Sequence, residues 1–392
     1  MLRYKIRSHS KCLLATSFVF LTILAGRAAL SQDIHADPAI HERMQKYVDD
    51  GQASGIVTLV ADHEHVLHLD AVGLADVEAK RPMKTDTMFA IASMTKPITA
   101  TAVMILKDDG RLKLDDPVSK YLPAFAEMKL KSGESAKNVM TIHHLLTHTS
   151  GLGGDQQNEG TLAETADALA KRPLDFEPGT KWQYSPSLNV AGRIVEVVSG
   201  ESFDQFLATH IFEPLDMKDT SFLPSEDKQV RVAKLYQPGK TAGTLEKATH
   251  WINDLSPTRT PNPSGGLFST AVDLSHYYQM ILGDGLRNAV PILSEDAVHE
   301  MTRVQTGELT TGFTPGNGWG LGFCVIQKPQ GVTEMLSSGS FGHGGAFGTQ
   351  GWMDPEKGLV FVLLIQRTNF GNSDASDMRG DFQRLAVKAF GK

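Results

Sequence analysis

The feature that most restricts the fold of this chain is a pair of predicted strand hairpins at its opposite ends, each with a predicted amphipathic helix on its outer side. The strands are predicted at residues 55–62, 65–72, 348–353 and 359–366, and the two helices at residues 40–50 and 377–390. The later hairpin turns at Asp354-Pro-Glu-Lys-Gly358, a composition typical of turns. We expect the two hairpins to share one antiparallel sheet, with the terminal helices covering one of its faces.

The segment between the hairpins is predicted to be mainly helical. Helices are expected over residues 97–109, from Ile142 to Leu146, and over residues 187–198, with Gly110 and Gly200 ending the first and the last. Stretches rich in proline and glycine at residues 237–243 and 257–266 are predicted to be surface loops, because apolar periodicity resumes on both sides.

These patterns predict an α+β protein with two lobes. One lobe, about residues 36–92 and 260–392, holds the antiparallel sheet and its flanking helices. The other, about residues 93–259, is a mainly helical insertion. A functional site is expected where the two lobes meet.

The first 31 residues are predicted to be a signal peptide. Arg3, Lys5, Arg7 and Lys11 precede the apolar stretch Cys12–Gly26, which is short for a membrane span, and small residues favour cleavage after Ser31. The mature protein, residues 32–392, is then exported to the periplasm or secreted, without stable membrane insertion. An uncleaved anchor is the alternative.

Charge and cysteine content exclude several classes of protein. The 392 residues carry a formal net charge of -7, and the predicted mature region has no basic run that could follow phosphates, so nucleic acid is not expected as a partner. Only Cys324 remains after cleavage, so no internal disulfide can form. It lies in the strand-like run Trp319–Ile326, which predicts a buried, inert thiol.

Ser93-Met-Thr-Lys96 is the pattern in this chain with the clearest catalytic potential. A serine hydroxyl needs a base to become a nucleophile, and on a helix a lysine three residues later shares its face. Burial would lower the pKa of that lysine towards a useful range. The same spacing occurs at Ser8/Lys11 and Ser225/Lys228, but those pairs lie in the predicted signal and in a charged loop.

Further segments give Ser93 and Lys96 a specific context. In chain order they are Met88–Lys96, Thr141–Leu152, Tyr184-Ser-Pro186, Ser264–Ser269, Trp319–Phe323 and Gly342-His-Gly-Gly345. This order resembles the landmarks of the beta-lactamase-related serine hydrolases, which include class C beta-lactamases, D,D-peptidases and esterases on the same scaffold. The resemblance spans roughly residues 40–390 and implies the serine beta-lactamase and penicillin-binding-protein fold.

The resemblance implies a role for each matching position. Ser93 corresponds to the acylated nucleophile, Lys96 to its partner base, and Tyr184 to a tyrosine that moves a proton between nucleophile and leaving group. The cation of Lys96 is expected to help ionise that tyrosine. The backbone N–H groups of Ser93 and Ala346 would form the oxyanion hole.

Two positions depart from the family pattern and bear on the substrate. His343-Gly344-Gly345 stands where the family has Lys-Thr-Gly, so a permanent cation is replaced by a group expected to titrate near neutrality. Pro186 stands where the lactamases and peptidases have an asparagine that holds a substrate amide. Both changes weaken recognition of amides that carry a carboxylate, which favours an esterase.

The expected reaction is hydrolysis of a small ester through an acyl-Ser93 intermediate, with no metal or organic cofactor. A beta-lactamase or D-Ala-D-Ala peptidase acting on lactams or peptides, and a non-hydrolytic penicillin-type sensor, are the alternatives. His63, His65 and His68 are interpreted as a solvated hairpin turn, because no matching set of metal ligands accompanies them. The oligomeric state stays open.

Overall fold

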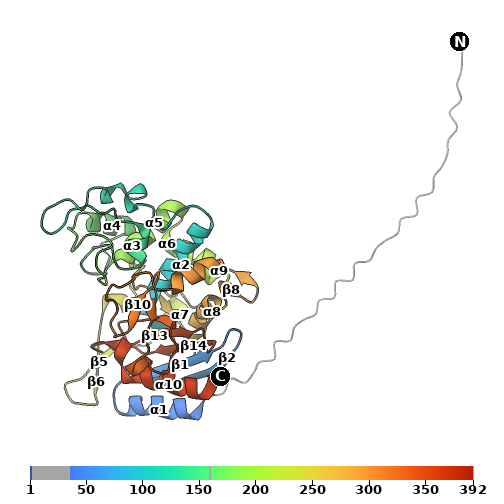
Figure 1. Ribbon diagram of the computed structural model, residues 1–392. Coiled ribbons are helices and arrows are strands. Elements are labelled where there is room, and N and C mark those ends of the chain that lie inside the picture. Colours follow the sequence, from blue (N-terminus) through green and yellow to red (C-terminus); the bar gives the residue numbers. More distant parts are fainter. Residues whose placement is uncertain (2–35, 159, 392) are drawn as a thin grey trace. The chain divides into compact units, whose positions relative to one another are not determined.

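The computed structural model describes Met1, residues 36–158 and residues 160–391. In this part of the chain, an antiparallel sheet has the strand order β10-β11-β12-β13-β14-β1-β2-β3 (Figure 1). Its strands are β1 (Gly55–Ala61), β2 (Val66–Asp76), β3 (Arg81–Pro82), β10 (Asn317–Trp319), β11 (Cys324–Ile326), β12 (Phe341–Gly344), β13 (Gln350–Asp354) and β14 (Leu359–Leu364). Because β1 pairs with β14, with Leu59 opposite Val362, the predicted shared sheet is confirmed.

Helices cover both faces of this sheet. On one face, Ile56 and Phe361 belong to the core beneath α1 (Pro38–Asp49) and α10 (Asp377–Phe390). On the other, Leu59 and Val362 pack in the core with α8 (Ala271–Leu282) and α2 (Thr95–Asp108). Strand side chains alternate between faces, so burial on both sides gives the central strands their continuous apolar sequence. Figure 1 shows α1 and α10 side by side over one face, as predicted.

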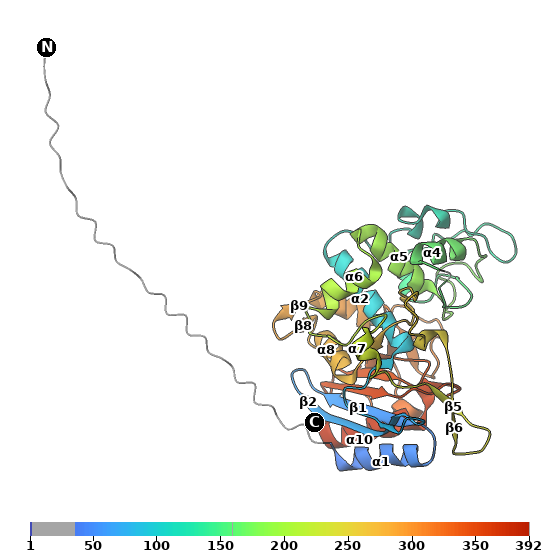
Figure 2. The same ribbon diagram turned by 180° about the vertical axis from the view of Figure 1, so that it is seen from behind.

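The inserted segment contains the predicted helices and several more. α5 (Ser187–Ser199) contacts α2, α3 (Ile142–Leu146) and α4 (Leu162–Ala170), and it ends at Gly200, whose φ is +83°. The segment is less helical than predicted, because long loops join its helices and the hairpin of β5 (Tyr236–Pro238) and β6 (Leu245–Lys247) extends from it (Figure 2). The remaining elements are α6 (Phe203–Leu207), α7 (Glu226–Gln229), α9 (Glu295–Thr302), the pair β4 (Phe89–Ala90) and β7 (Phe268–Ser269), and the pair β8 (Leu286–Arg287) and β9 (Val290–Pro291).

The predicted surface loop at residues 257–266 is only partly at the surface. From Asn262 onward it is buried, and the carbonyl of Pro263 accepts a hydrogen bond from Thr99 of α2. Proline and glycine allow this loop to pack closely against α5, since a Cβ added at Gly192 of α5 would lie 2.3 Å from the Pro263 ring. The prediction of exposure is therefore wrong for its second half, because loop composition does not distinguish a packed loop from a solvated one.

The run Trp319–Ile326 is not a single strand. It contains Trp319, the last residue of β10, and the whole of β11. These two strands pair with each other across a turn where Gly322 has a φ of +75°. Cys324 is buried, and the side-chain amide of Asn317 donates to its Sγ. Burial raises the pKa of this thiol, so the predicted inert thiol is confirmed.

Among the described residues, no helix is both long and apolar enough to cross a membrane. Apart from Met1, the predicted signal peptide, residues 1–31, lies outside the described residues.

His68 is fully buried, whereas His63 and His65 are exposed at the hairpin turn. The interpretation of His68 as a solvated residue is wrong, because strand alternation turns its ring inward. Its Nδ1 accepts the N–H of Asp37 at 2.9 Å, so Nε2 carries the proton and donates to Thr58 Oγ1, also at 2.9 Å. A neutral ring satisfies both contacts, and burial lowers the pKa of His68 to about 4.

We expect the protein to lose stability as the pH falls from about 6.5 to about 4. Burial lowers the pKa values of His68, His144 and His276 each to about 4, while unfolded histidine titrates near 6.5. In this window the unfolded chain binds more protons, so acid favours unfolding, by on the order of 1 to 3 kcal/mol per histidine. Thermal unfolding at a series of pH values measures the effect.

The matched variants for this test are His68→Asn and His63→Asn. Loss of the buried His68 should flatten the dependence of the unfolding temperature on pH. Loss of the exposed His63 should leave that dependence unchanged. Equal slopes in both variants would contradict the assignment.

Candidate active site

Ser93 lies in a short 3-10 turn, Ala92–Met94, between β4 and the start of α2. Ala92 has a φ of +47°, which is uncommon for a residue with a side chain, so the backbone bends sharply just before the serine. Gly345 packs against this turn, and a Cβ there would lie 2.5 Å from the carbonyl oxygen of Ile91. Glycine at this position lets the end of β12 approach Ser93.

Ser93, Tyr184 and the segment His343–Ala346 line one cavity of about 170 Å³. Phe313 and residues 371–374 form the rest of its wall. Positions that are far apart in the sequence thus meet at a single small hollow, as the landmark order predicts. Lys96 lies beside Ser93, behind this wall.

Lys96 is fully buried one helical turn after Ser93. Its Nζ lies 3.2 Å from Ser93 Oγ and donates to the side-chain oxygen of Gln156 at 2.8 Å and to the carbonyl of Ser264 at 2.6 Å. Burial holds the pKa of this amine well below its usual 10.5. The amine therefore lies where it can exchange a proton with the Ser93 hydroxyl.

Tyr184 joins this pair from the loop before α5. Its ring centroid is 4.5 Å from Lys96 Nζ. Desolvation raises the pKa of Tyr184 above its ordinary value, the nearby side chains of Ser93 and Gln156 oppose this rise, and Asp374 adds to it. Burial opposes ionisation of both Lys96 and Tyr184, so the expectation that a charged Lys96 helps to ionise this tyrosine stays a prediction.

His343 is 2% exposed and holds one fixed tautomer. Its Nδ1 lies 2.6 Å from the carbonyl oxygen of Gly344, which can only accept, so Nδ1 carries the hydrogen and Nε2 is a bare acceptor. Nε2 has no hydrogen-bond partner among the described residues. Burial, with a contribution from Lys96, lowers the pKa of His343 to about 3. The expectation that His343 titrates near neutrality is therefore wrong: it is neutral at physiological pH.

Backbone donors and glycines complete the wall beside Ser93. Ala346 is exposed, and its N–H makes no hydrogen bond with the described residues. Gly344 and Gly345 bring the strand edge close: a Cβ at Gly344 would lie 1.8 Å from Asp374 Oδ1. The predicted oxyanion hole of Ser93 and Ala346 is compatible with this geometry.

Pro186 does not line the cavity. It is buried at the N-cap of α5, where its φ of -75° and ψ of 13° lead the chain into the helix directly after the Tyr184 loop. Its role in substrate recognition stays a prediction, because its position is structural in the unliganded protein.

Three residues of the site were not identified from the sequence: Gln156, Phe313 and Asp374. Gln156 and Phe313 come from loops rich in Gly, Thr and Asn, which have no periodicity to mark them. The Phe313 ring lies 5.0 Å from Tyr184, edge to face, and its carbonyl accepts from Asn372. Asp374 precedes the last helix, where an acidic residue usually indicates only a helix start.

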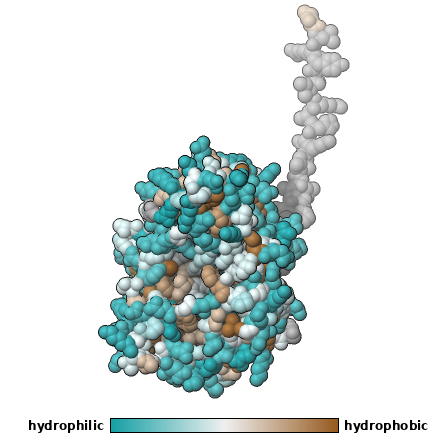
Figure 3. All heavy atoms as spheres, turned by 60° about the vertical axis from the view of Figure 1, so that its left-hand side comes forward, coloured by the Kyte–Doolittle hydropathy of each residue, from teal (hydrophilic) through white to brown (hydrophobic). Residues whose placement is uncertain are grey.

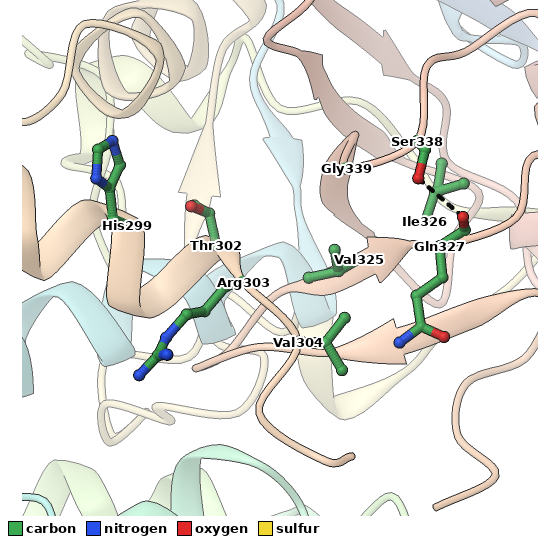
Figure 4. Close-up of a pocket in the computed structure, with 9 residues that line it drawn as sticks. All are labelled: His299, Thr302, Arg303, Val304, Val325, Ile326, Gln327, Ser338 and Gly339. Atoms are coloured by element: carbon green, nitrogen blue, oxygen red, sulfur yellow. Dashed lines mark hydrogen bonds between the residues drawn. The ribbon is translucent and has the colours of Figure 1, made fainter. Parts of the chain in front are cut away.

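A larger hollow of about 490 Å³ lies elsewhere, between α9 and β11 (Figure 4). Its hydroxyl groups are engaged: Ser338 donates to the carbonyl of Gln327 and Thr302 to that of Val298. No lysine lines it. It therefore lacks a nucleophile paired with a base.

The face in Figure 3 is mainly hydrophilic, with apolar side chains gathered across its middle.

Among the described residues, side chains that could bind a metal ion come together at Asp284, Glu295 and His299. All three are exposed, and none lies in the cavity beside Ser93.

The fold and the site together define a serine hydrolase of the Ser-x-x-Lys kind. The chain belongs to the Beta-lactamase family, which it matches over residues 40–386.

Its relatives include hydrolases and a penicillin-binding protein. Esterase EstB of Burkholderia gladioli is 32% identical over 384 residues, covering 89% of this chain and 93% of its own length. Penicillin-binding protein 4 of Amycolatopsis lactamdurans is 35% identical over 308 residues, covering 76% and 77%. Among solved structures, EstCE1, a hydrolase with promiscuous acyltransferase activity, aligns with a TM-score of 0.77 at 26% identity, covering 88% of this chain and 97% of that one.

Proposed function

We propose that the protein is a carboxylesterase that hydrolyses small esters through an acyl-Ser93 intermediate, in the exported compartment that residues 1–31 predict. The observation that carries the proposal is the buried Lys96 amine, which lies 3.2 Å from the Ser93 hydroxyl and has a pKa held well below its usual value. Among the described residues, no lysine or arginine lines the adjoining cavity to bind a substrate carboxylate. The esterase relative, at 32% identity over most of both chains, supports it. A cavity of about 170 Å³ suits short acyl or alcohol groups.

Acylation begins when Ser93 Oγ attacks the ester carbonyl and its proton moves to Lys96 Nζ. The N–H groups of Ser93 and Ala346 bind the oxygen that becomes negative. The departing alkoxide takes the hydroxyl proton of Tyr184, and the new Lys96 ammonium stabilises the phenolate across the short distance between them. The alcohol then leaves with Ser93 acylated.

Deacylation reverses these roles. The Tyr184 phenolate takes a proton from a water molecule, which attacks the acyl carbon. As the acid departs, the Lys96 ammonium returns its proton to Ser93 Oγ. Every proton is thereby restored, and the net change is ester plus water giving acid plus alcohol.

A parallel turnover assay tests this function. We expect p-nitrophenyl acetate and butyrate to give a higher kcat/KM than a cephalosporin or a D-Ala-D-Ala peptide, because an activated ester requires little beyond the nucleophile and the oxyanion donors. A higher kcat/KM for the cephalosporin would replace the esterase with a beta-lactamase. Stable acylation by penicillin without turnover of any ester would indicate a sensor.

Restoring the two family residues should shift the preference towards lactams. We expect Pro186→Asn combined with His343→Lys to raise cephalosporin turnover relative to ester turnover by on the order of a hundredfold or more, since each of the two restored hydrogen bonds contributes about 1 to 3 kcal/mol. Asparagine is a favourable N-cap, so α5 should tolerate the first change. Steady-state kinetics of both single variants and of the double variant measure the shift, with His343→Met as the uncharged control.

A further inference from the structure

Asp374 brings a carboxyl group into the wall of the Ser93 cavity, a feature that the proposed esterase mechanism does not use. It lies in the turn Ser373–Ala375 between β14 and α10 and is 8% exposed. Its Oδ1 touches the backbone of Gly344, where a Cβ would lie 1.8 Å away. The carboxyl group therefore sits against the same strand edge that leads to Ala346.

The carboxyl group is held by neutral partners. Oδ1 accepts from the side-chain amide of Gln350 at 3.1 Å, and Gln350 in turn accepts from the indole N–H of Trp352 at 2.7 Å. The buried Arg379 stacks on Trp352 at 3.7 Å and donates to the main-chain carbonyl of Asp374, so it fixes the turn. No ion pair joins Arg379 to the Asp374 carboxylate among the contacts of the described residues.

The second oxygen, Oδ2, is the one available to a ligand. It accepts no hydrogen bond from the described residues, and it is not completely enclosed by protein atoms. Asp374 lines the cavity. One oxygen of its carboxyl group is therefore held by an amide, and the other keeps its capacity to accept a hydrogen bond or pair with a cation.

Burial opposes a charge on the other ionisable groups around the cavity. It holds the pKa of Lys96 well below its usual value, lowers that of His343 to about 3 and raises that of Tyr184. Burial also raises the pKa of Asp374, while Arg379 opposes that rise. A carboxylate on the substrate would meet no cation here, whereas a quaternary ammonium group would meet the free oxygen of Asp374.

We propose that Asp374 is a specificity-determining residue that selects esters carrying a positive charge over neutral ones, and neutral esters over those carrying a carboxylate. This proposal rests on the proposed esterase function and deepens it. Gly344 ends β12 and is two residues from Ala346, which is at most about 7 Å of chain, so the carboxyl group would lie within a few bonds of the ester carbonyl. An ion pair in a partly buried cavity is strong enough to rank substrates.

Two matched substrate series test the proposal, one with the charge on the alcohol and one with the charge on the acyl group. The first compares butyrylcholine, its uncharged isostere 3,3-dimethylbutyl butyrate, and 3-butyryloxypropanoate. The second compares methyl 4-(trimethylammonio)butyrate, methyl 5,5-dimethylhexanoate and monomethyl glutarate. Hydrolysis is followed by pH-stat titration at pH 7.5.

In at least one series we expect the cationic ester to exceed its neutral isostere in kcat/KM by about tenfold, and the anionic ester to fall below it by a similar factor. Asp374→Asn should remove most of this ranking while the neutral ester is still hydrolysed. Asp377→Asn, which removes the same charge from an exposed position three residues on, should leave the ranking unchanged. Asp374→Ser provides a smaller uncharged side chain if asparagine disturbs the turn.

The possible failures are distinguishable. If no neutral ester is hydrolysed, the esterase function itself is wrong. If neutral esters are hydrolysed but kcat/KM does not follow the charge of the ester in either series, the role of Asp374 is refuted. This conclusion does not require that the Asp374 variants fold. A ranking that survives in a folded Asp374→Asn protein also overturns the proposal, because the selectivity would then come from another group.

Discussion

Replacing Ser93 by alanine is expected to reduce ester hydrolysis to the uncatalysed rate and to abolish labelling by a serine-directed phosphonate. The Ser93 hydroxyl is the one that lies 3.2 Å from the Lys96 amine and also reaches the open cavity. Loss of a nucleophile removes the covalent route altogether, so the effect should be among the largest that any single substitution produces. Turnover of p-nitrophenyl butyrate and intact-mass analysis after labelling measure it.

Ser225→Ala is the matched control for this substitution. Ser225 and Lys228 repeat the spacing of the site, but Ser225 is an exposed N-cap residue of α7. Lys228 donates to the carbonyl of Lys218 and pairs with Asp219. Both activity and labelling should be unchanged in this variant. Labelling that persists in Ser93→Ala would place the nucleophile elsewhere.

Lys96→Met is expected to slow acylation by about a thousandfold, because it removes the group that takes the serine proton. Methionine approximately fills the space of the lysine, and the buried amine has no carboxylate partner, so the unfolding temperature should change by only a few degrees. Stopped-flow measurement of the acylation phase, together with thermal unfolding, separates the two effects.

The control for this variant is Lys228→Met, which should retain full acylation. Acylation at a near-normal rate in a folded Lys96→Met protein would contradict the role of Lys96 as the base. Tyr184, which lines the same cavity as Ser93, would then be the group to test next.

The elements near the chain ends are well predicted, because their apolar residues follow a clear period and are bounded by turn residues. The last helix begins at Asp377 and ends at Phe390 as expected, and β1 and β14 pair as the two hairpins suggest. The meeting of Ser93, Tyr184 and His343 follows from ordered motifs that the chain shares with its family.

What the sequence could not predict depends on burial. Local sequence gives no measure of desolvation, so it predicts neither the burial of His68 nor the lowered pKa of His343, and enclosure favours the neutral ring in both. The buried half of the loop at residues 257–266 has the composition of a solvated loop. Gln156 and Asp374 reach the site through long-range packing that no periodic pattern records.

The pairing of β1 with β14 also has a consequence for how the protein becomes active during synthesis. Partners such as Leu59 and Val362 are about 300 residues apart, so the centre of the sheet can close only when nearly the whole chain is available. Ser93 emerges early, whereas Ala346 and Asp374 emerge among the last residues. A ribosome-bound chain therefore carries its nucleophile without the opposite wall of the cavity. Hydrolytic activity should arise in a single late step that coincides with docking of α10.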